Sequence, residues 1–365
     1  MTGSLVRENI GNLAVYRPGK PIEEVQRELG LQRVIKLASN ENPLGPSPRA
    51  VEAVTRAAGG IALYPDGSAH RLRHALARFH GVDPEAVILG NGSNEIVQMV
   101  SLAVLNPGDE AVMPVPSFPR YQPLARLMNA RPVEVALTGD FRLDLESMAV
   151  HLGPRTKLVY ICNPNNPTGT INTRKEVDRF LERVPRETLV IFDEAYFEYV
   201  EDQRYPDGLD YLRAGHNVLV LRTFSKVYGL AGLRIGYAVG DPNLIAYLNR
   251  VREPFNVNAL AQEAALAALE DQKFVERTRE NNRRGKAQLY RAFEHLDLPY
   301  VPTEANFILF DAGRNEREVF QRLLRRGVII RGGFGYPTML RVTIGTQEEN
   351  NAFISALEAV LEEDF

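Results

Sequence analysis

The chain has 365 residues, 44% of them hydrophobic and 24% charged, so it can bury a large core, and we expect two domains or one domain with an appended lobe. The formal net charge of −3 provides no general attraction to nucleic acid or an anionic membrane, and we expect neither as a partner. One cysteine, Cys162, excludes a disulfide framework and favours the reducing cytoplasm, and no apolar run approaches the length of a membrane span.

The N-terminal stretch from residue 16 to residue 48 is rich in Pro, Gly and Asn. It contains one predicted helix at 22–29 and one predicted strand at 34–38. This composition is typical of an arm that wraps another part of the protein.

Residues 48–252 alternate short apolar strands with helices, which predicts an α/β fold with a mostly parallel sheet covered on both faces. The predicted strands are 87–89, 111–113, 133–135, 158–161, 189–192, 218–221 and 235–239, and the helices include 49–58, 71–79, 95–105 and 174–183. Ligands of such sheets bind at the carboxyl ends of the strands. We therefore expect residues 48–254 to form a large cofactor-binding domain.

The pattern changes after Pro254. The predicted elements are helical segments over 259–295, strands at 307–310, 328–330 and 340–344, and helices at 316–326 and 347–363. This mixture predicts that residues 255–365 form a smaller α+β domain.

Two turns early in the large domain are candidates for contacts with a ligand. The run Gly90-Asn91-Gly92-Ser93-Asn94-Glu95 joins a strand to a helix, so the backbone amides of Ser93 and Asn94 form an anion site suited to phosphate. Phe118 follows the next strand and is suited to stacking on a flat ring. Taken alone, Ser93 is equally well explained as an ordinary N-cap, and Phe118 as an aromatic residue of the core.

Polar side chains also follow two later predicted strands. In the run Cys162-Asn163-Pro164-Asn165-Asn166-Pro167-Thr168-Gly169, a tight turn places Asn166 over a ligand. Asp193 lies at the C-terminal end of an apolar predicted strand, and Tyr196 follows it three residues later. An anion such as Asp193 keeps a pyridine nitrogen protonated, and Asn166 and Tyr196 can hydrogen-bond the phenolic oxygen of the same ring. The alternatives are a simple turn and an Asp that caps the next helix.

The run Thr223-Phe224-Ser225-Lys226 follows a later strand. A lysine there is costly to desolvate, and its lowered pKa favours imine formation with an aldehyde cofactor. Ser225 and Arg234 flank Lys226 and can hold a phosphate. Taken alone, the Ser-Lys pair is more often part of a surface loop.

Charged residues of the C-terminal part suggest a substrate anion. Arg331 and Arg341 lie at or beside predicted strands, although surface or internal ion pairs would explain them too. His70 and His74 share one helix face, but no third ligand is spaced to join them, so we expect no metal.

The order of these motifs resembles that of the aspartate-aminotransferase superfamily, the fold-type I pyridoxal-phosphate enzymes, and the resemblance covers essentially the whole chain. It implies a seven-stranded sheet in the large domain and a smaller domain built from both chain ends, with residues 1–47 as the arm and part of that domain. It also implies a homodimer with shared active sites.

The resemblance assigns a role to each motif residue. Lys226 is the Schiff-base lysine and Asp193 the partner of the pyridine nitrogen. The other implied contacts with pyridoxal 5′-phosphate come from Tyr64 of the neighbouring subunit, Ser93, Asn94, Phe118, Asn166, Tyr196, Ser225 and Arg234.

Within the superfamily, the chain is similar to the histidinol-phosphate aminotransferases. The matching runs are Tyr16-Arg17-Pro18-Gly19-Lys20-Pro21, residues 36–46, residues 328–331 and residues 340–346. They imply Tyr16, Asn42, Arg331 and Arg341 as substrate-binding residues. The implied reaction moves an amino group between glutamate and imidazole acetol phosphate, giving histidinol phosphate and 2-oxoglutarate. Two residues depart from the family's pattern. Val227 stands after the lysine where a small residue is usual, and Phe118 stands where many relatives have Tyr, so both affect how the cofactor fits.

Three alternatives stay open at this point. The same site suits an aminotransferase for aromatic amino acids, because a carboxylate can replace the phosphate. The scaffold also serves threonine-phosphate decarboxylases. A cofactor-binding regulator or non-catalytic homologue is the alternative from another class.

Overall fold

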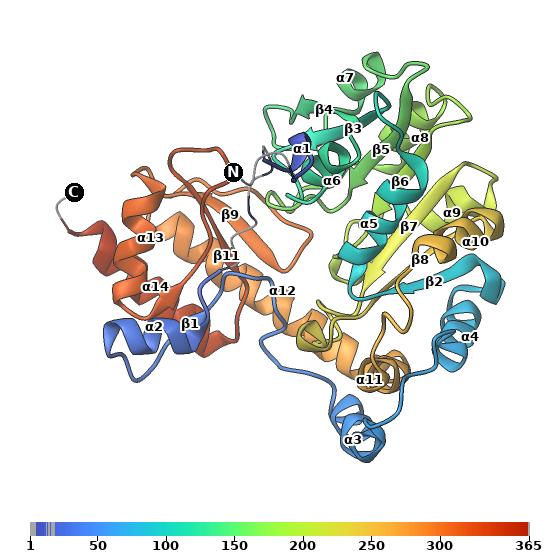
Figure 1. The fold of residues 1–365 in the computed structure, drawn as a ribbon. Coiled ribbons are helices and arrows are strands. Elements are labelled where there is room, and N and C mark those ends of the chain that lie inside the picture. The colour runs from blue at the N-terminus through green and yellow to red at the C-terminus, as the bar shows by residue number, and fades with distance from the viewer. Residues whose placement is uncertain (1–4, 12, 14, 16–18, 364–365) are drawn as a thin grey trace.

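The computed structural model describes residues 5–11, 13, 15 and 19–363 (Figure 1). One part of the molecule contains a seven-stranded sheet between helices. The other part, on the left in Figure 1, contains two small sheets and the last helices of the chain.

The large sheet has the strand order β2-β8-β7-β6-β5-β3-β4. Its strands are β2 (Val87–Gly90), β3 (Glu110–Val115), β4 (Arg131–Ala136), β5 (Thr156–Cys162), β6 (Leu189–Asp193), β7 (Val218–Thr223) and β8 (Gly236–Gly240). Only β8 runs against its neighbours β2 and β7, and the remaining pairs are parallel. The predicted mostly parallel seven-stranded sheet is confirmed.

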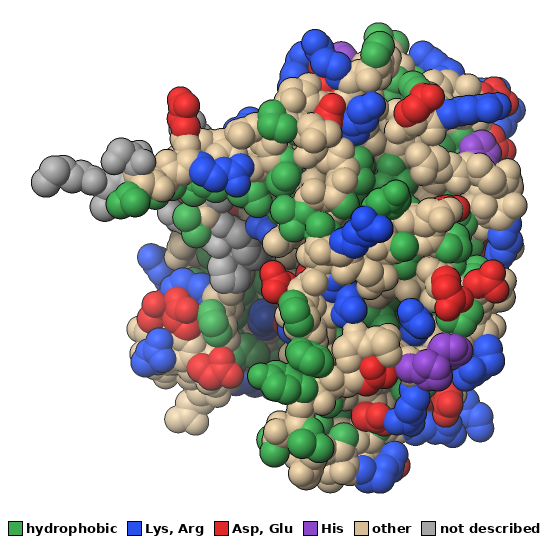
Figure 2. Space-filling view, turned by 45° about the vertical axis from the view of Figure 1, so that its right-hand side comes forward, with side chains coloured by type: hydrophobic (Ala, Val, Ile, Leu, Met, Phe, Trp, Pro, Cys, Tyr) green, Lys and Arg blue, Asp and Glu red, His purple; other side chains and the backbone are tan. Residues whose placement is uncertain are grey.

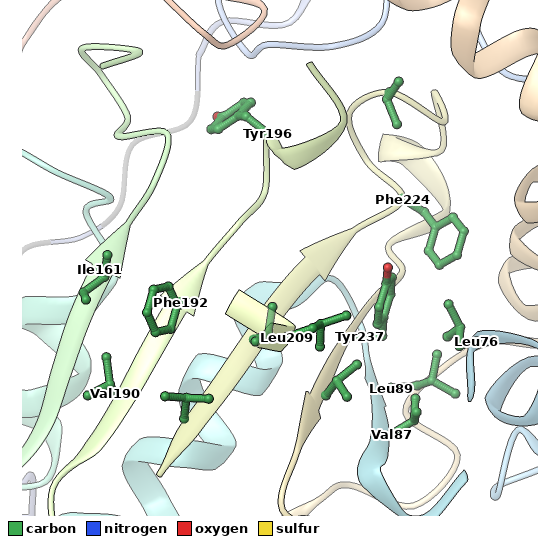
Figure 3. Close-up of a cluster of buried hydrophobic side chains, with 14 of the residues drawn as sticks. Leu76, Val87, Leu89, Ile161, Val190, Phe192, Tyr196, Leu209, Phe224 and Tyr237 are labelled. Carbon is green, nitrogen blue, oxygen red and sulfur yellow. The ribbon is translucent and has the colours of Figure 1, made fainter. Parts of the chain in front are cut away.

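Helices cover both faces of this sheet, as its apolar strands require. One face carries α5 (Ser93–Val104), α6 (Tyr121–Leu127) and α10 (Pro242–Val251). The other carries α4 (His70–His80), α7 (Leu145–Val150), α8 (Arg174–Leu181), α9 (Gly208–Arg213) and α11 (Ala259–Glu270). The helices on each face of the sheet enclose a hydrophobic core, and successive side chains of β6 point alternately into these two cores. Val190 and Phe192 lie in the core of Figure 3, and Leu189 and Ile191 lie in the opposite one.

The smaller part joins the two ends of the chain. Strand β1 (Ile35–Lys36) pairs in parallel with β10 (Val328–Ile329), and β9 (Phe307–Asp311) pairs antiparallel with β11 (Met339–Thr343). The helices around these strands are α2 (Ile22–Leu29), α12 (Gln272–His295), α13 (Glu316–Arg325) and α14 (Gln347–Leu361). The pairing of β1 with β10 joins a segment of the N-terminal arm to the C-terminal residues.

The remaining elements connect the parts. Helix α3 (Pro48–Ala57) packs against α11, and α12 runs from α11 into the smaller part (Figure 1). Helix α1 (Glu8–Gly11) lies against α6, where the Asn9 amide donates to the Leu127 carbonyl at 2.9 Å. Short 3-10 turns occur at Ala58–Gly60, Pro84–Ala86, Phe197–Tyr199 and Ala231–Leu233. Within the described ranges, no helix is long and apolar enough to cross a membrane.

Candidate active site

The predicted site residues of the large sheet lie at the carboxyl ends of three adjacent strands. Asn166 follows β5, Asp193 ends β6 and is followed by Tyr196, and Lys226 follows β7. Figure 3 shows Tyr196 just beyond the end of β6. Since parallel strands present these ends at one edge of the sheet, residues distant in sequence meet there.

The Lys226 ammonium lies within this group. Its Nζ atom donates to the carbonyl of Ser39 at 3.0 Å and lies 5.7 Å from the centre of the Tyr196 ring. Burial, together with the nearby Arg341 guanidinium, lowers the pKa of Lys226 to about 8. At neutral pH a usable fraction of this amine is therefore neutral and nucleophilic.

Asp193 is a deeply buried carboxyl, with 5% of its surface exposed. The Tyr121 hydroxyl donates to its Oδ2 atom at 2.6 Å, and the Ala195 amide donates to Oδ1 at 3.3 Å. Burial raises the pKa of Asp193, whereas the Tyr121 hydrogen bond and the Lys226 charge act in the opposite direction. The sequence prediction missed Tyr121, although its place three residues after Phe118 is readable as part of the same motif.

Several groups that can donate hydrogen bonds meet where α5 begins. A Cβ atom on Gly92 would lie 2.4 Å from Nη2 of Arg234, and one on Gly236 would lie 2.5 Å from the Ser93 amide nitrogen. The Arg234 guanidinium also lies 3.5 Å from Oγ of Ser225. The structure thus brings Ser93, Ser225 and Arg234 together around a helix N-terminus with no room for larger side chains at the glycines.

Arg341 is held in place by the chain's own groups, and 6% of its surface is exposed. Its Nη2 atom donates to the Ala38 carbonyl at 2.7 Å, and its Nη1 atom donates to Oδ1 of Asn166. The Phe307 and Phe334 rings lie 5.0 and 5.3 Å from its Cζ atom. The guanidinium is therefore held in one orientation by groups of the chain itself.

Other predicted residues lie around this centre or away from it. The side-chain Oδ1 atom of Asn94 accepts from Nε of Arg120 at 3.2 Å, and the centres of the Phe118 and Tyr121 rings lie 5.4 Å apart in an edge-on contact. The Asn42 amide donates to the carbonyl of Val227 at 2.8 Å, next to Lys226, and to Thr278 Oγ1 at 3.1 Å. Its contacts tie the arm to the loop that carries Lys226.

Tyr64 and Arg331 have surroundings different from those of the residues above. Tyr64 lies on the surface with 82% exposure and stacks on Phe255 at 4.7 Å. Arg331 pairs with Arg341 through mutual backbone hydrogen bonds of 3.0 and 2.7 Å and lines a cavity of about 280 Å³ beside Lys20. Tyr16 lies outside the described residues. No cluster of three metal-ligating side chains occurs among the residues described.

Comparisons with known proteins show which family the chain resembles. The family model "Aminotransferase class I and II" matches residues 32–357. The chain is 56% identical to histidinol-phosphate aminotransferase of Moorella thermoacetica over 97% of this chain and 92% of that protein. It is 49% identical to histidinol-phosphate aminotransferase 2 of Carboxydothermus hydrogenoformans, covering 98% and 99% of the two chains.

Solved structures have the same fold. The histidinol-phosphate aminotransferase of Sinorhizobium meliloti in complex with pyridoxal-5′-phosphate superposes with a TM-score of 0.90 at 29% identity, covering 98% of each chain. Aspartate aminotransferase of Thermus thermophilus with maleate gives a TM-score of 0.82 at 27% identity, covering 97% and 98%. From the matched residues and the near-complete coverage, the chain belongs to the class I and II aminotransferase family.

Proposed function

We propose that this chain catalyses pyridoxal-phosphate-dependent transfer of an amino group between glutamate and imidazole acetol phosphate, giving histidinol phosphate and 2-oxoglutarate. One observation carries the proposal: an amine with a pKa of about 8, Lys226, lies close to a buried carboxyl and a preoriented guanidinium. The similarity to two histidinol-phosphate aminotransferases over nearly the whole chain supports this choice of substrate.

The residues present fit pyridoxal phosphate. The close approach of Arg234 to Gly92 leaves a basic, glycine-lined cradle suited to the phosphate, with Ser225 and the Ser93 and Asn94 amides as further donors. Asp193 suits the pyridine nitrogen, Tyr196 and Asn166 the phenolic oxygen, and Phe118 the face of the ring. When bound, this cofactor supplies an aldehyde and a ring that accepts negative charge from the substrate's α-carbon.

Lys226 and Asp193 have distinct roles in this proposal. The neutral Lys226 amine attaches the cofactor and, once displaced by the substrate amine, takes the proton from the substrate's α-carbon. Asp193 remains a carboxylate and holds the pyridine nitrogen protonated. The hydrogen bond from Tyr121 favours that charged form against the cost of burial.

Substrate binding is proposed to depend on Arg341, Arg331, Asn42 and Tyr16. Glutamate and histidinol phosphate differ in shape, but each presents an anion. Arg341 is suited to the carboxylate of one and the phosphate of the other, because a guanidinium binds either group with two hydrogen bonds. Arg331, joined to Arg341 by backbone pairing, is suited to the phosphate alone.

We also propose a cytoplasmic homodimer in which Tyr64 completes the neighbouring subunit's site. Large apolar side chains lie on the surface after α3: Ile61, Leu63 and Tyr64 are 67%, 77% and 82% exposed, and Tyr64 stacks on Phe255, which is 45% exposed. Apolar side chains also gather at the lower edge of Figure 2, the end where α3 lies in Figure 1. A contiguous apolar surface of this kind favours a protein partner.

The division into domains at residues 47 and 254 stays a prediction. The packing of α11 against α3 and α4 associates it with the large sheet. This contact favours a boundary between the two parts near α12 rather than at Pro254.

The test of substrate choice is a pair of half-reactions, with glutamate and with histidinol phosphate, followed by the absorption of the bound cofactor. Arg341→Ala should slow both, each by roughly 30-fold or more, because losing a charge-assisted contact to a buried anion costs about 2–5 kcal/mol. Arg331→Ala should slow the histidinol phosphate reaction more than the glutamate reaction.

A control variant separates a specific contact from general charge. Arg317 lines the same cavity as Arg331 with 89% of its side chain exposed, so Arg317→Ala should leave both rates within about twofold. Equal losses for both substrates in Arg331→Ala, with phenylalanine used as well as histidinol phosphate, would favour an aromatic aminotransferase instead.

A further inference from the structure

Asn40 is a buried residue of the arm, with 2% exposure and a left-handed backbone at φ 56°. Its amide nitrogen Nδ2 lies 2.8 Å from the Tyr196 hydroxyl. Its backbone nitrogen and its Oδ1 atom both contact Oγ1 of Thr343, at 3.0 and 3.2 Å, and its carbonyl accepts from Nδ2 of Asn306 at 3.0 Å. Every polar group of Asn40 is therefore engaged.

The direction of each hydrogen bond follows from the chemistry of the groups. A backbone N–H can only donate, so Oγ1 of Thr343 accepts from Asn40 and its own hydrogen goes to Oδ1 of Asn40. This contact fixes the side-chain amide with its NH₂ group toward Tyr196. An amide nitrogen only donates, so the Tyr196 oxygen accepts and its hydrogen is left to point elsewhere.

The Tyr196 hydroxyl keeps that hydrogen. Burial raises the pKa of this phenol, and Arg341 and the Asn40 hydrogen bond only partly offset the effect. The titratable and charged groups that face Tyr196 are Arg341 of β11, Lys226 after β7, Cys162 and Asp193 at the ends of β5 and β6, and Tyr199 of the adjoining 3-10 turn. Among the hydrogen bonds between described residues, the Tyr196 hydroxyl takes part in one, as the acceptor from Asn40.

We propose that Asn40 and Thr343 are positioning residues that orient the Tyr196 hydroxyl as a hydrogen-bond donor to the phenolic oxygen of bound pyridoxal phosphate. This inference rests on the proposed function. Asn40 and Thr343 belong to the smaller part of the molecule, whereas Tyr196 follows β6 of the large sheet (Figure 1). The orientation of the donor therefore depends on the contact between the two parts.

The consequence is measurable in the absorption spectrum of the bound cofactor. A donor to the phenolic oxygen stabilises the more negative form of the chromophore, which is the form present at high pH. The donor therefore lowers the pH midpoint of the spectral change, and its removal raises the midpoint. One charge-assisted hydrogen bond corresponds to a shift of about one pH unit.

The experiment measures this midpoint in a double-mutant cycle of Asn40→Asp and Tyr196→Phe. Aspartate tolerates the left-handed backbone conformation as asparagine does. Its carboxylate, however, accepts a hydrogen bond from the Tyr196 hydroxyl, so this hydroxyl no longer donates to the cofactor. Tyr196→Phe should raise the midpoint by about one unit. Asn40→Asp should raise it by at least as much when Tyr196 is present and by clearly less in the Tyr196→Phe background, where only the added charge acts.

Two further variants separate orientation from general packing. Thr343→Val removes the group that fixes the Asn40 amide and should raise the midpoint by a smaller amount, and Thr343→Ser should restore it. Asn306→Ala removes a hydrogen bond to the backbone carbonyl of Asn40 and leaves the contacts of the Asn40 side chain in place, so it should leave the midpoint unchanged.

The outcomes distinguish this inference from the proposed function. Absence of a cofactor band from the unaltered protein would refute the function, and the inference with it. A midpoint that responds to Tyr196→Phe, but shifts equally in Asn40→Asp with and without Tyr196, would overturn the inference alone. So would a shift in Asn306→Ala as large as that in Thr343→Val.

Discussion

Removal of the Tyr121 hydroxyl is the most direct test of how the buried Asp193 is kept ionised. In Tyr121→Phe the carboxylate loses its 2.6 Å hydrogen bond, but the ring keeps its stack on Tyr160 at 4.1 Å. A hydrogen bond to a charged group contributes about 1.5–3 kcal/mol. If Asp193 must be a carboxylate in the transition state, the loss corresponds to a roughly 10- to 100-fold slower proton abstraction.

The pH dependence makes this prediction specific. Burial raises the pKa of Asp193 and the Tyr121 hydrogen bond opposes that effect, so the variant's pKa should rise further. The reaction needs the deprotonated form, so the loss should be largest at low pH and should shrink as pH rises. The assay is the single-turnover glutamate half-reaction between pH 6 and pH 9, with α-deuterated glutamate to confirm that proton abstraction is being observed.

The matched control is Tyr160→Phe, which removes a hydroxyl from the other ring of the same stack and leaves the hydrogen bond to Asp193 in place. Its rate should stay within about threefold of the unaltered protein. An unchanged rate in Tyr121→Phe, or an equal and pH-independent loss in both variants, would refute the reasoning.

The site leads to four further predictions. The rate at which pyridoxal phosphate reattaches to the cofactor-free protein should rise with pH around a midpoint near 8, because only the neutral Lys226 amine attacks the aldehyde. Stopped-flow absorbance measures this rate. A midpoint near the pKa of free lysine would contradict the assignment. Borohydride should fix the cofactor to Lys226, as checked by peptide mapping, and Lys226→Ala should lower turnover by several orders of magnitude. Asp193→Asn should keep the cofactor bound yet slow proton abstraction severely, and near-normal turnover would mean that the electron-sink role is wrong. In a mixed dimer of Tyr64→Phe and Lys226→Ala chains, one site should stay intact if Tyr64 acts across the interface, and none if it acts within its own chain.

Most strands and long helices could be predicted from the sequence because their apolar periodicity is strong. Helix α2 begins and ends at the predicted residues, and β5, β6 and β7 lie where expected. The short helices α6 and α9 were not predicted, since seven and six residues give too little periodicity, and α6 contains Pro123. Helix α10 was missed despite a readable signal, Asp241 as N-cap with Pro242 after it.

The polar groups that follow strands could also be predicted, because a parallel sheet brings its carboxyl ends together. Contacts between distant segments could not. The hydrogen bonds of Arg341 to Ala38 and of Asn40 to Thr343 each join residues 303 positions apart, and no local pattern encodes them. The Ser39 carbonyl that accepts from Lys226 is a backbone atom, so its residue type carries no signal.

The two charges at the centre of the site are linked in a way that suits the proposed chemistry. Arg341 is among the groups that lower the pKa of Lys226, so the free site holds an amine neutral enough to attach the cofactor at physiological pH. Under the proposed function, Arg341 then binds the carboxylate or phosphate of the substrate. That anion offsets the guanidinium charge and raises the pKa of the displaced lysine toward its ordinary value. Lys226 thereby becomes a stronger base when the substrate is in place, which is when a proton must be removed from the α-carbon.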